Sequence, residues 1–199
     1  MKPILFSTAM VVAILENRKN MTRRVIKPQP RLCGETIDSG DCLIPNCCGY
    51  DEEHFCNGTL AKPRYQIGEV LYVRETWLRL GKTYCYRADG EINEKPHLDS
   101  KLDKWKPSIH MPKEAARIFL RVTDVRVERV QSILCGDMKA EGCIPPTVKG
   151  GQWQQWQRDY FAPLWNSING KRNDGIYAWE KNPWVWVYTF ERCEKSEGE

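Results

Sequence analysis

The hydrophobic pattern of the first residues predicts a strand followed by a buried helix. Residues 4–6 form a short apolar run, and Ser7 or Thr8 can cap a helix that continues to about Asn17. This helix is apolar on nearly every side, which indicates that it is buried. It leads directly into a basic segment that begins at Arg18.

An alternation of side chains with a period of two predicts the clearest strand at residues 70–77. On one face of this strand, Glu75 lies between apolar neighbours. A buried carboxylate requires a partner. We expect that partner to be a cation lining a pocket, Lys19 or Arg24; the alternative is a salt bridge at the end of a strand.

Further strands complete the predicted sheet, beginning with a short one at residues 84–87. The alternation over residues 117–127 changes parity at Thr123-Asp124, which predicts a bulge or bend. Such bends are typical of barrels and strongly curled sheets. Residues 184–190 are apolar on both faces, so we expect this last strand in the middle of the sheet.

Two helices are predicted before the last strand. The first, over residues 136–141, is closed by Gly142, and the second, over residues 152–168, is expected to bend at Pro163. The second helix carries a stripe of large side chains: Trp153, Trp156, Tyr160, Leu164 and Ile168. Its helical spacing favours core packing over base stacking. The summed pattern predicts an α+β fold, a curled and mostly β sheet with flanking helices.

The segment at residues 105–112 is expected to be extended, because each of its prolines holds the preceding residue out of the helical region. Ser108 and His110 would then share one side of a stiff pocket wall. A serine beside a histidine suggests a hydrolase, but no third group or nucleophile elbow is visible, so structural packing is preferred. The charged residues 91–104 are typical of a surface loop.

Composition narrows the class of protein. The chain has 199 residues, of which 41% are hydrophobic, and this suits one domain rather than two. A net charge of +4 is compatible with a polyanionic partner. Residues 16–19 (ENRK) stand where a signal peptide would need a small-residue cleavage site, and no other apolar run reaches the roughly 18 residues of a membrane helix. We expect a soluble, cytoplasmic protein without a membrane partner.

Nine cysteines are many, but their number is odd and no export signal is evident, so reduced thiols are expected. Five of them lie with His54 between residues 31 and 63, in a stretch rich in Gly, Asn and Asp. Two alternatives stay open for this stretch: a loop insertion with free thiols, or a zinc site that lacks the usual CxxC spacing. The zinc ligands would be Cys33, Cys42, Cys47 and Cys56.

The segment at residues 19–24 (KNMTRR) carries the most distinctive chemistry. Lysine supplies a compact charge, arginine a planar fork suited to phosphate, and threonine a hydroxyl that donates or attacks. Strand alternation implies that only one of Arg23 and Arg24 faces inward. On charge alone, a solvated basic loop is the simpler explanation.

Three stretches of the chain resemble the ASCH family, a branch of the PUA-like superfamily. Residues 13–24 (AILENRKNMTRR) are similar to its IL-x-G-x-K-x-x-T-x-R opening. Residues 65–77 (YQIGEVLYVRETW) look like its PGD-x-L-x-V-R-E-x-W strand, and residues 140–142 (AEG) resemble its A-x-x-E-G helix end. Asn17 stands where the family usually has Gly. With residues 107–112 and 182–184, the order is most similar to the long ASCH proteins of bacteriophages and prophages.

The resemblance implies a PUA-like fold, a curled sheet or small β-barrel with a cleft. Family members bind RNA or process modified nucleosides, and one branch hydrolyses N4-acetylcytidine with a lysine, a threonine and a glutamate. Lys19, Thr22 and Glu141 match these three by motif. Lys19 would depress the pKa of Thr22 or hold an oxyanion, Thr22 would attack the acyl carbon, and Glu141 would shuttle a proton. Glu141 is equally explained as a surface residue at a helix end.

The expected function is binding of RNA, another single-stranded nucleic acid or a modified nucleoside, with a base held in a basic cleft. The alternative is an N4-acetylcytidine amidohydrolase or a ribonuclease. The expected ligand contacts are Arg23, Arg24, Glu75, Trp77, Tyr86, Ser108 and His110. Family spacing selects Arg24 as the inward arginine, and Trp77 either stacks on a base or fills the core.

The predicted organisation is a single domain. It spans residues 1–192, with the Cys-rich insertion at about residues 31–63 and a disordered tail at residues 193–199. No cofactor is expected, and the sequence does not predict an oligomeric state.

Overall fold

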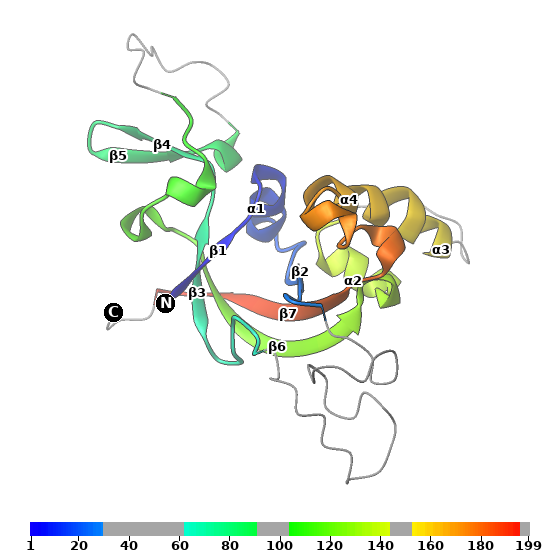
Figure 1. The fold of residues 1–199 in the computed structure, drawn as a ribbon. Coiled ribbons are helices and arrows are strands. Elements are labelled where there is room, and N and C mark those ends of the chain that lie inside the picture. The colour runs from blue at the N-terminus through cyan, green and yellow to red at the C-terminus, as the bar shows by residue number, and fades with distance from the viewer. Residues whose placement is uncertain (30–61, 91–103, 144–152, 196–199) are drawn as a thin grey trace.

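A five-stranded sheet forms the centre of the molecule (Figure 1). The computed structural model describes residues 1–29, 62–90, 104–143 and 153–195. In spatial order the strands are β1 (Lys2–Leu5), β3 (Val70–Arg74), β6 (Phe119–Arg129), β7 (Trp184–Cys193) and β2 (Met21–Val25). β1 and β3 run parallel, and the other neighbouring strands run antiparallel.

The long antiparallel pair β6 and β7 contains the predicted bulge. The register of this pair shifts between Val122 and Asp124, which confirms the bulge expected at Thr123-Asp124. Both strands curve in Figure 1, in keeping with the bend that a bulge introduces. β7 lies between β6 and β2, so its predicted central position is also confirmed. The predicted fold class, an α+β fold with a curled sheet and flanking helices, is therefore confirmed.

Helix α1 (Thr8–Leu15) connects the two edge strands, β1 and β2. Val11 and Ile14 of this helix are buried in a core cluster shared with β1, β3, β6 and β7. The helix ends before Asn17, which has a φ of 57°. Asparagine tolerates this left-handed conformation, so Asn17 makes the turn at the position where the ASCH motif has glycine.

The strand predicted at residues 70–77 is divided in two. β3 stops after five residues, and β4 (Trp77–Leu80) pairs with β5 (Thr83–Tyr86) in a separate two-stranded sheet. This hairpin projects from the main sheet in Figure 1. Alternation does not reveal the break, because Trp77 beyond it is again buried, in a small cluster with Met111.

Three helices pack on β2 and β7 through a second core cluster. They are α2 (Cys135–Ala140), α3 (Trp153–Trp156) and α4 (Ala162–Asn169). A π-helical turn (Gln157–Phe161) separates α3 from α4. The wider turn shifts the face that meets the sheet, so the predicted stripe is partly wrong. Tyr160 and Ile168 are exposed, whereas Trp156, Phe161 and Trp165 fill the core; the side chain of Trp153 lies outside the described residues.

The prediction of an extended segment at residues 105–112 is wrong in part. Ser108–His110 forms a 3-10 turn, because each proline restricts itself and its predecessor and leaves the residues between them free to turn. At the other end of the chain, β7 reaches Cys193, so the predicted tail begins too early.

Two predicted features fall outside the described residues. These are the loop at residues 91–103 and most of the Cys-rich insertion, including Cys33, Cys42, Cys47, Cys56 and His54, so the zinc hypothesis stays a prediction. No helix in the described part of the chain is long and apolar enough to cross a membrane.

Candidate functional site

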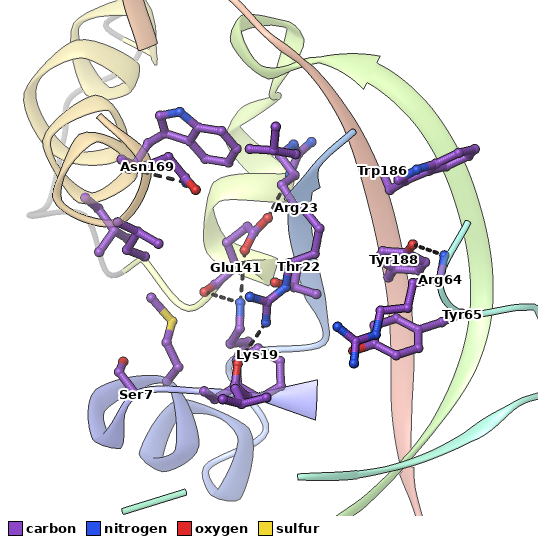
Figure 2. A pocket seen from close by; sticks show the side chains of 18 of the residues that line it. Ser7, Lys19, Thr22, Arg23, Arg64, Tyr65, Glu141, Asn169, Trp186 and Tyr188 are labelled. Atoms are coloured by element: carbon purple, nitrogen blue, oxygen red, sulfur yellow. Dashed lines mark hydrogen bonds and ion pairs between the residues drawn. The ribbon is translucent and has the colours of Figure 1, made fainter. Parts of the chain in front are cut away.

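A cavity of about 720 Å³ opens beside the edge strand β2, between α1 and α4 (Figure 2). Its lining includes Phe6, Ser7 and Met10 near α1, Thr22, Arg24, Trp186 and Tyr188 on the sheet, and Leu164, Trp165, Ile168 and Asn169 on α4. Because β2 has a neighbouring strand on one side only, side chains from both faces of the sheet reach this opening.

The pairing of β2 with β7 sets the side chains of one wall. Thr22 lies opposite Tyr188, and Arg24 lies opposite Trp186. Strand alternation places these four side chains on one face of the sheet and sends Arg23 to the other. A hydroxyl and a guanidinium are therefore brought beside two aromatic rings.

The aromatic wall is fixed by its own contacts. The Tyr188 hydroxyl accepts a hydrogen bond from the Arg64 backbone N–H at 3.2 Å. Tyr65 packs edge-on against Tyr188, with ring centroids 5.1 Å apart, and donates its hydroxyl hydrogen to the Pro3 carbonyl at 2.8 Å. Burial raises the pKa of both phenols, so they are neutral near neutral pH. Trp186 is half-buried and lines the cavity.

Lys19 lies in the cavity wall with 3% of its surface exposed. Its ammonium donates to the Met21 carbonyl at 2.6 Å, to the Glu141 carbonyl at 2.9 Å and to Glu141 Oε2 at 2.9 Å. Burial lowers the pKa of Lys19, and the Glu141 carboxylate offsets this only in part. Because an ammonium has three N–H bonds, Lys19 has no free donor in this conformation.

Glu141 is held against Lys19 by the backbone. The two residues form an isolated antiparallel bridge. Next to it, Gly142 has a φ of +86°, and a Cβ there would lie 3.0 Å from the Ala13 Cβ and 3.3 Å from the Lys19 Cβ. Glycine is thus required at this position for both the backbone angle and the close approach. Since Glu141 is only 6% exposed, its interpretation as a surface residue is wrong.

Cys143 is not a suitable nucleophile at this site. Burial raises the pKa of its thiol to about 11, with a further contribution from the charge of Glu141. The thiol therefore stays protonated near neutral pH, whereas the reactive species is the thiolate.

Arg23 reaches the cavity wall, but its charge is matched by three carboxylates. Its guanidinium forms ion pairs with Asp137 at 2.6 Å, Glu128 at 2.9 Å and Glu141 at 3.3 Å. These contacts join β2 to β6 and to α2. The structure therefore gives Arg23 a role in holding the site together and does not favour the predicted ligand contact.

Arg24 differs from its neighbour because no carboxylate in the described residues forms an ion pair with it. One guanidinium nitrogen donates to the Leu5 carbonyl at 2.9 Å, and the group lies over the Phe6 ring, 5.4 Å from its centroid. Burial lowers the pKa of Arg24, yet an arginine in a protein keeps its proton. Arg24 is therefore a permanent charge at the cavity with donors left for a ligand.

Two further polar side chains line the cavity and are more than nine-tenths buried: Thr22 and Asn169. The Thr22 hydroxyl makes no hydrogen bond to the described residues. Asn169 donates from Nδ2 to the Trp165 carbonyl at 3.4 Å, which leaves its Oδ1 without a partner in the same part of the chain. Neither oxygen is among the fully buried unpaired polar atoms of the described residues, so a hydroxyl and an amide oxygen remain accessible to a bound molecule.

Comparison with known proteins adds little to this geometry. No known family model matches the chain, and no curated protein matches it. Among solved structures, the chain is similar to the crystal structure of a protein from Enterococcus faecalis assigned to the family model DUF984, with 9% sequence identity and a TM-score of 0.44. The similarity covers 100% of this chain and 85% of that chain. A likeness this distant indicates at most a remote relation of fold and carries no argument about the site.

The structure corrects the predicted partner of Glu75. The carboxylate is 1% exposed and accepts two hydrogen bonds from Arg117, at 2.9 and 3.1 Å. Arg117 also pairs with Asp89 at 2.7 Å. Burial raises the pKa of Glu75, and Arg117 opposes this effect. Glu75 follows the last residue of β3 and does not line the cavity. The alternative, a salt bridge at the end of a strand, is confirmed.

Of the four other predicted ligand contacts, Ser108 alone lines the cavity in the described structure. Trp77 is buried, with the Lys106 ammonium 4.9 Å from its ring centroid, so it fills the core. Tyr86 donates its hydroxyl hydrogen to a backbone carbonyl at 2.6 Å. His110 is exposed, and no hydrogen bond joins it to Ser108 within the described residues, so the hydrolase arrangement of these two side chains is not formed.

Several residues that shape the cavity carry no distinctive sequence signal: Arg64, Asn169, Arg172, Trp186 and Tyr188. The two aromatic residues belong to a strand that is apolar on both faces, so the sequence pattern predicts that they lie in the core. The two arginines stand in turn-rich stretches, where a basic residue is ordinarily solvated. Their proximity depends on long-range pairing, which no local pattern encodes.

Proposed function

We propose that the chain binds RNA or another single-stranded nucleic acid, or a modified nucleoside derived from it, and holds one base in the cavity beside β2. The observation that carries this proposal is the positive charge of Arg24, which has no ion pair among the described residues, opposite the half-buried Trp186 that lines the same cavity. Aromatic rings stack on any base, and arginine contacts the backbone or the base edge.

The remaining features of the cavity support the same ligand class. A volume of about 720 Å³ is in the usual range for small-molecule sites, which suits one nucleotide-sized group. Thr22 and Asn169 supply neutral polar contacts beside the aromatic and cationic side chains of the lining. Such buried polar groups give selectivity, because a ligand that leaves them unpaired binds more weakly.

A second function, hydrolysis of an N4-acylated cytidine, is favoured by one observation. The Thr22 hydroxyl, which makes no hydrogen bond to the described residues, lines the same cavity as the Lys19 and Glu141 pair. In this reaction the Thr22 oxygen attacks the acyl carbon and its proton passes to Glu141. The cytidine amine then leaves with a proton, and water hydrolyses the acyl-threonine to restore the hydroxyl. Because its three donors are engaged, Lys19 would act here by holding Glu141 in place.

One experiment separates the two functions. Labelled single-stranded RNA is titrated with the protein at two salt concentrations, and acetate release from N4-acetylcytidine is measured in parallel for the native protein and for Thr22→Val. We expect salt-sensitive binding without acetate release. Acetate release that is lost in Thr22→Val would instead establish the hydrolase. Absence of both binding and release would contradict the proposal.

A further inference from the structure

We infer that the ligand of the cavity carries a phosphate group, and that Arg24, Arg64 and Arg172 form the subsite that binds this phosphate. This inference rests on the proposed function. The bound species would then be a nucleotide or a phosphorylated chain end rather than a free nucleoside. None of the sequence motifs points to Arg64 or Arg172.

The three arginines converge from separate parts of the chain. Arg24 belongs to β2, Arg64 precedes β3, and Arg172 follows α4, and all three line the same cavity. In Figure 2, Arg64 lies on the side of the aromatic wall, near Tyr65 and Tyr188. Its guanidinium lies 5.5 Å from the centroid of the Tyr65 ring, which limits its freedom.

No carboxylate of the described residues forms an ion pair with any of the three. Glu141 is the one acidic residue in the cavity lining of the described structure, and it is already bound by Lys19 and Arg23. Two lysines, Lys27 and Lys62, also line the cavity. Among the described residues that line it, the cavity therefore has more positive than negative charge.

The arginine charges also act on one another. Burial is the main cause that lowers the pKa of Arg24; Tyr65 and the charge of Glu141 oppose it, and the charges of Arg172 and Arg64 add smaller lowering effects. Like charges held near one another repel. An anion placed among them removes this repulsion, which gives the ligand a favourable interaction that a neutral nucleoside cannot supply.

Phosphate fits this group better than a single carboxylate does. A phosphate monoester carries a charge of about −1.5 to −2 near pH 7 and several acceptor oxygens. The planar fork of arginine binds such oxygens in pairs. Three guanidinium groups provide more donors than one carboxylate can accept, so the donor count favours phosphate.

The test compares ligands that differ only in the phosphate. The four ribonucleosides and their 3′- and 5′-monophosphates are titrated into the full-length protein by calorimetry. We expect at least one monophosphate to bind at least tenfold more tightly than its nucleoside. Arg64→Gln and Arg172→Gln should each weaken monophosphate binding at least fivefold and leave nucleoside binding within about twofold. Lys171→Gln is the matched control, because Lys171 is an exposed cation beside Arg172 that does not line the cavity.

Each outcome decides between the two proposals. Equal affinity for nucleosides and monophosphates would overturn the phosphate subsite and leave the proposed function standing. A phosphate preference that Lys171→Gln reduces as much as Arg172→Gln would overturn the assignment to these arginines. If no nucleoside, monophosphate or single-stranded RNA binds, the proposed function itself fails.

Discussion

Replacing Arg24 by glutamine is expected to weaken the binding of single-stranded RNA roughly 10- to 100-fold, the range that corresponds to one charge-assisted contact of about 1.5–3 kcal/mol. The free energy of unfolding should change by less than about 1 kcal/mol, because Arg24 donates to one backbone carbonyl and has no ion pair among the described residues. Fluorescence anisotropy and chemical denaturation measure the two quantities.

The control for Arg24 is Arg74→Gln. Arg74 also donates to a backbone carbonyl, that of Ile109 at 3.2 Å, and lies over an aromatic ring, that of Tyr72 at 5.7 Å. Because Arg74 does not line the cavity, its substitution should leave RNA affinity within about twofold. Equal loss in both variants would show that Arg24 acts only through the overall charge of the protein.

Replacing Lys19 by methionine is expected to lower the free energy of unfolding by about 3–5 kcal/mol. The substitution removes the Lys19 donor from Glu141 Oε2 and from two backbone carbonyls, and leaves Glu141 with only the longer contact from Arg23 to Oε1 among the described residues. Removing the carboxylate as well, in Lys19→Met with Glu141→Leu, should restore a large part of the loss, since a buried ion pair is often replaceable by apolar side chains of similar volume. Urea denaturation monitors all three proteins.

A loss below about 1 kcal/mol for Lys19→Met would contradict the described ion pair. If the double variant proved no more stable than Lys19→Met alone, the cost would lie in lost packing instead of the carboxylate that has lost Lys19.

The sequence predicts the fold best where one face of an element is buried. Two examples are the bulge at Thr123-Asp124, visible as a change of parity, and the central strand β7, visible as apolar positions on both faces. Two features of the fold cannot be predicted from the burial pattern. A buried Trp77 beyond the turn preserves the alternation across the end of β3. Pro163, which follows the π-helical turn, predicts a bend at this place but does not predict the change of helical phase.

The candidate site, like the fold, is predicted from the sequence only in part. Local motifs bring attention to Lys19, Thr22 and Glu141, and their closeness follows from the backbone bridge between Lys19 and Glu141. The identity of an ion-pair partner is a different matter, because it depends on which element packs nearby. Glu75 is buried as expected. Its partner Arg117 comes from the segment before β6, and the sequence pattern around Glu75 does not indicate this partner.

The adjacent arginines show most clearly what alternation can decide. The pattern predicts that Arg23 and Arg24 face opposite sides, and the register of β2 with β7 agrees. Which of the two is neutralised depends on Glu128 of β6, Asp137 in the first turn of α2 and Glu141 just after α2. That information lies more than one hundred residues away along the chain, and no local pattern supplies it.

Photo-cross-linking with single-stranded RNA that contains 4-thiouridine tests most directly whether a base occupies the cavity beside β2. Mass spectrometry of the digested complex should place the cross-link on the peptide that contains Trp186 and Tyr188, and Arg24→Gln should reduce its yield while Arg74→Gln does not. Cross-links confined to segments that do not line the cavity, such as the β4 and β5 hairpin, would contradict base binding at this site.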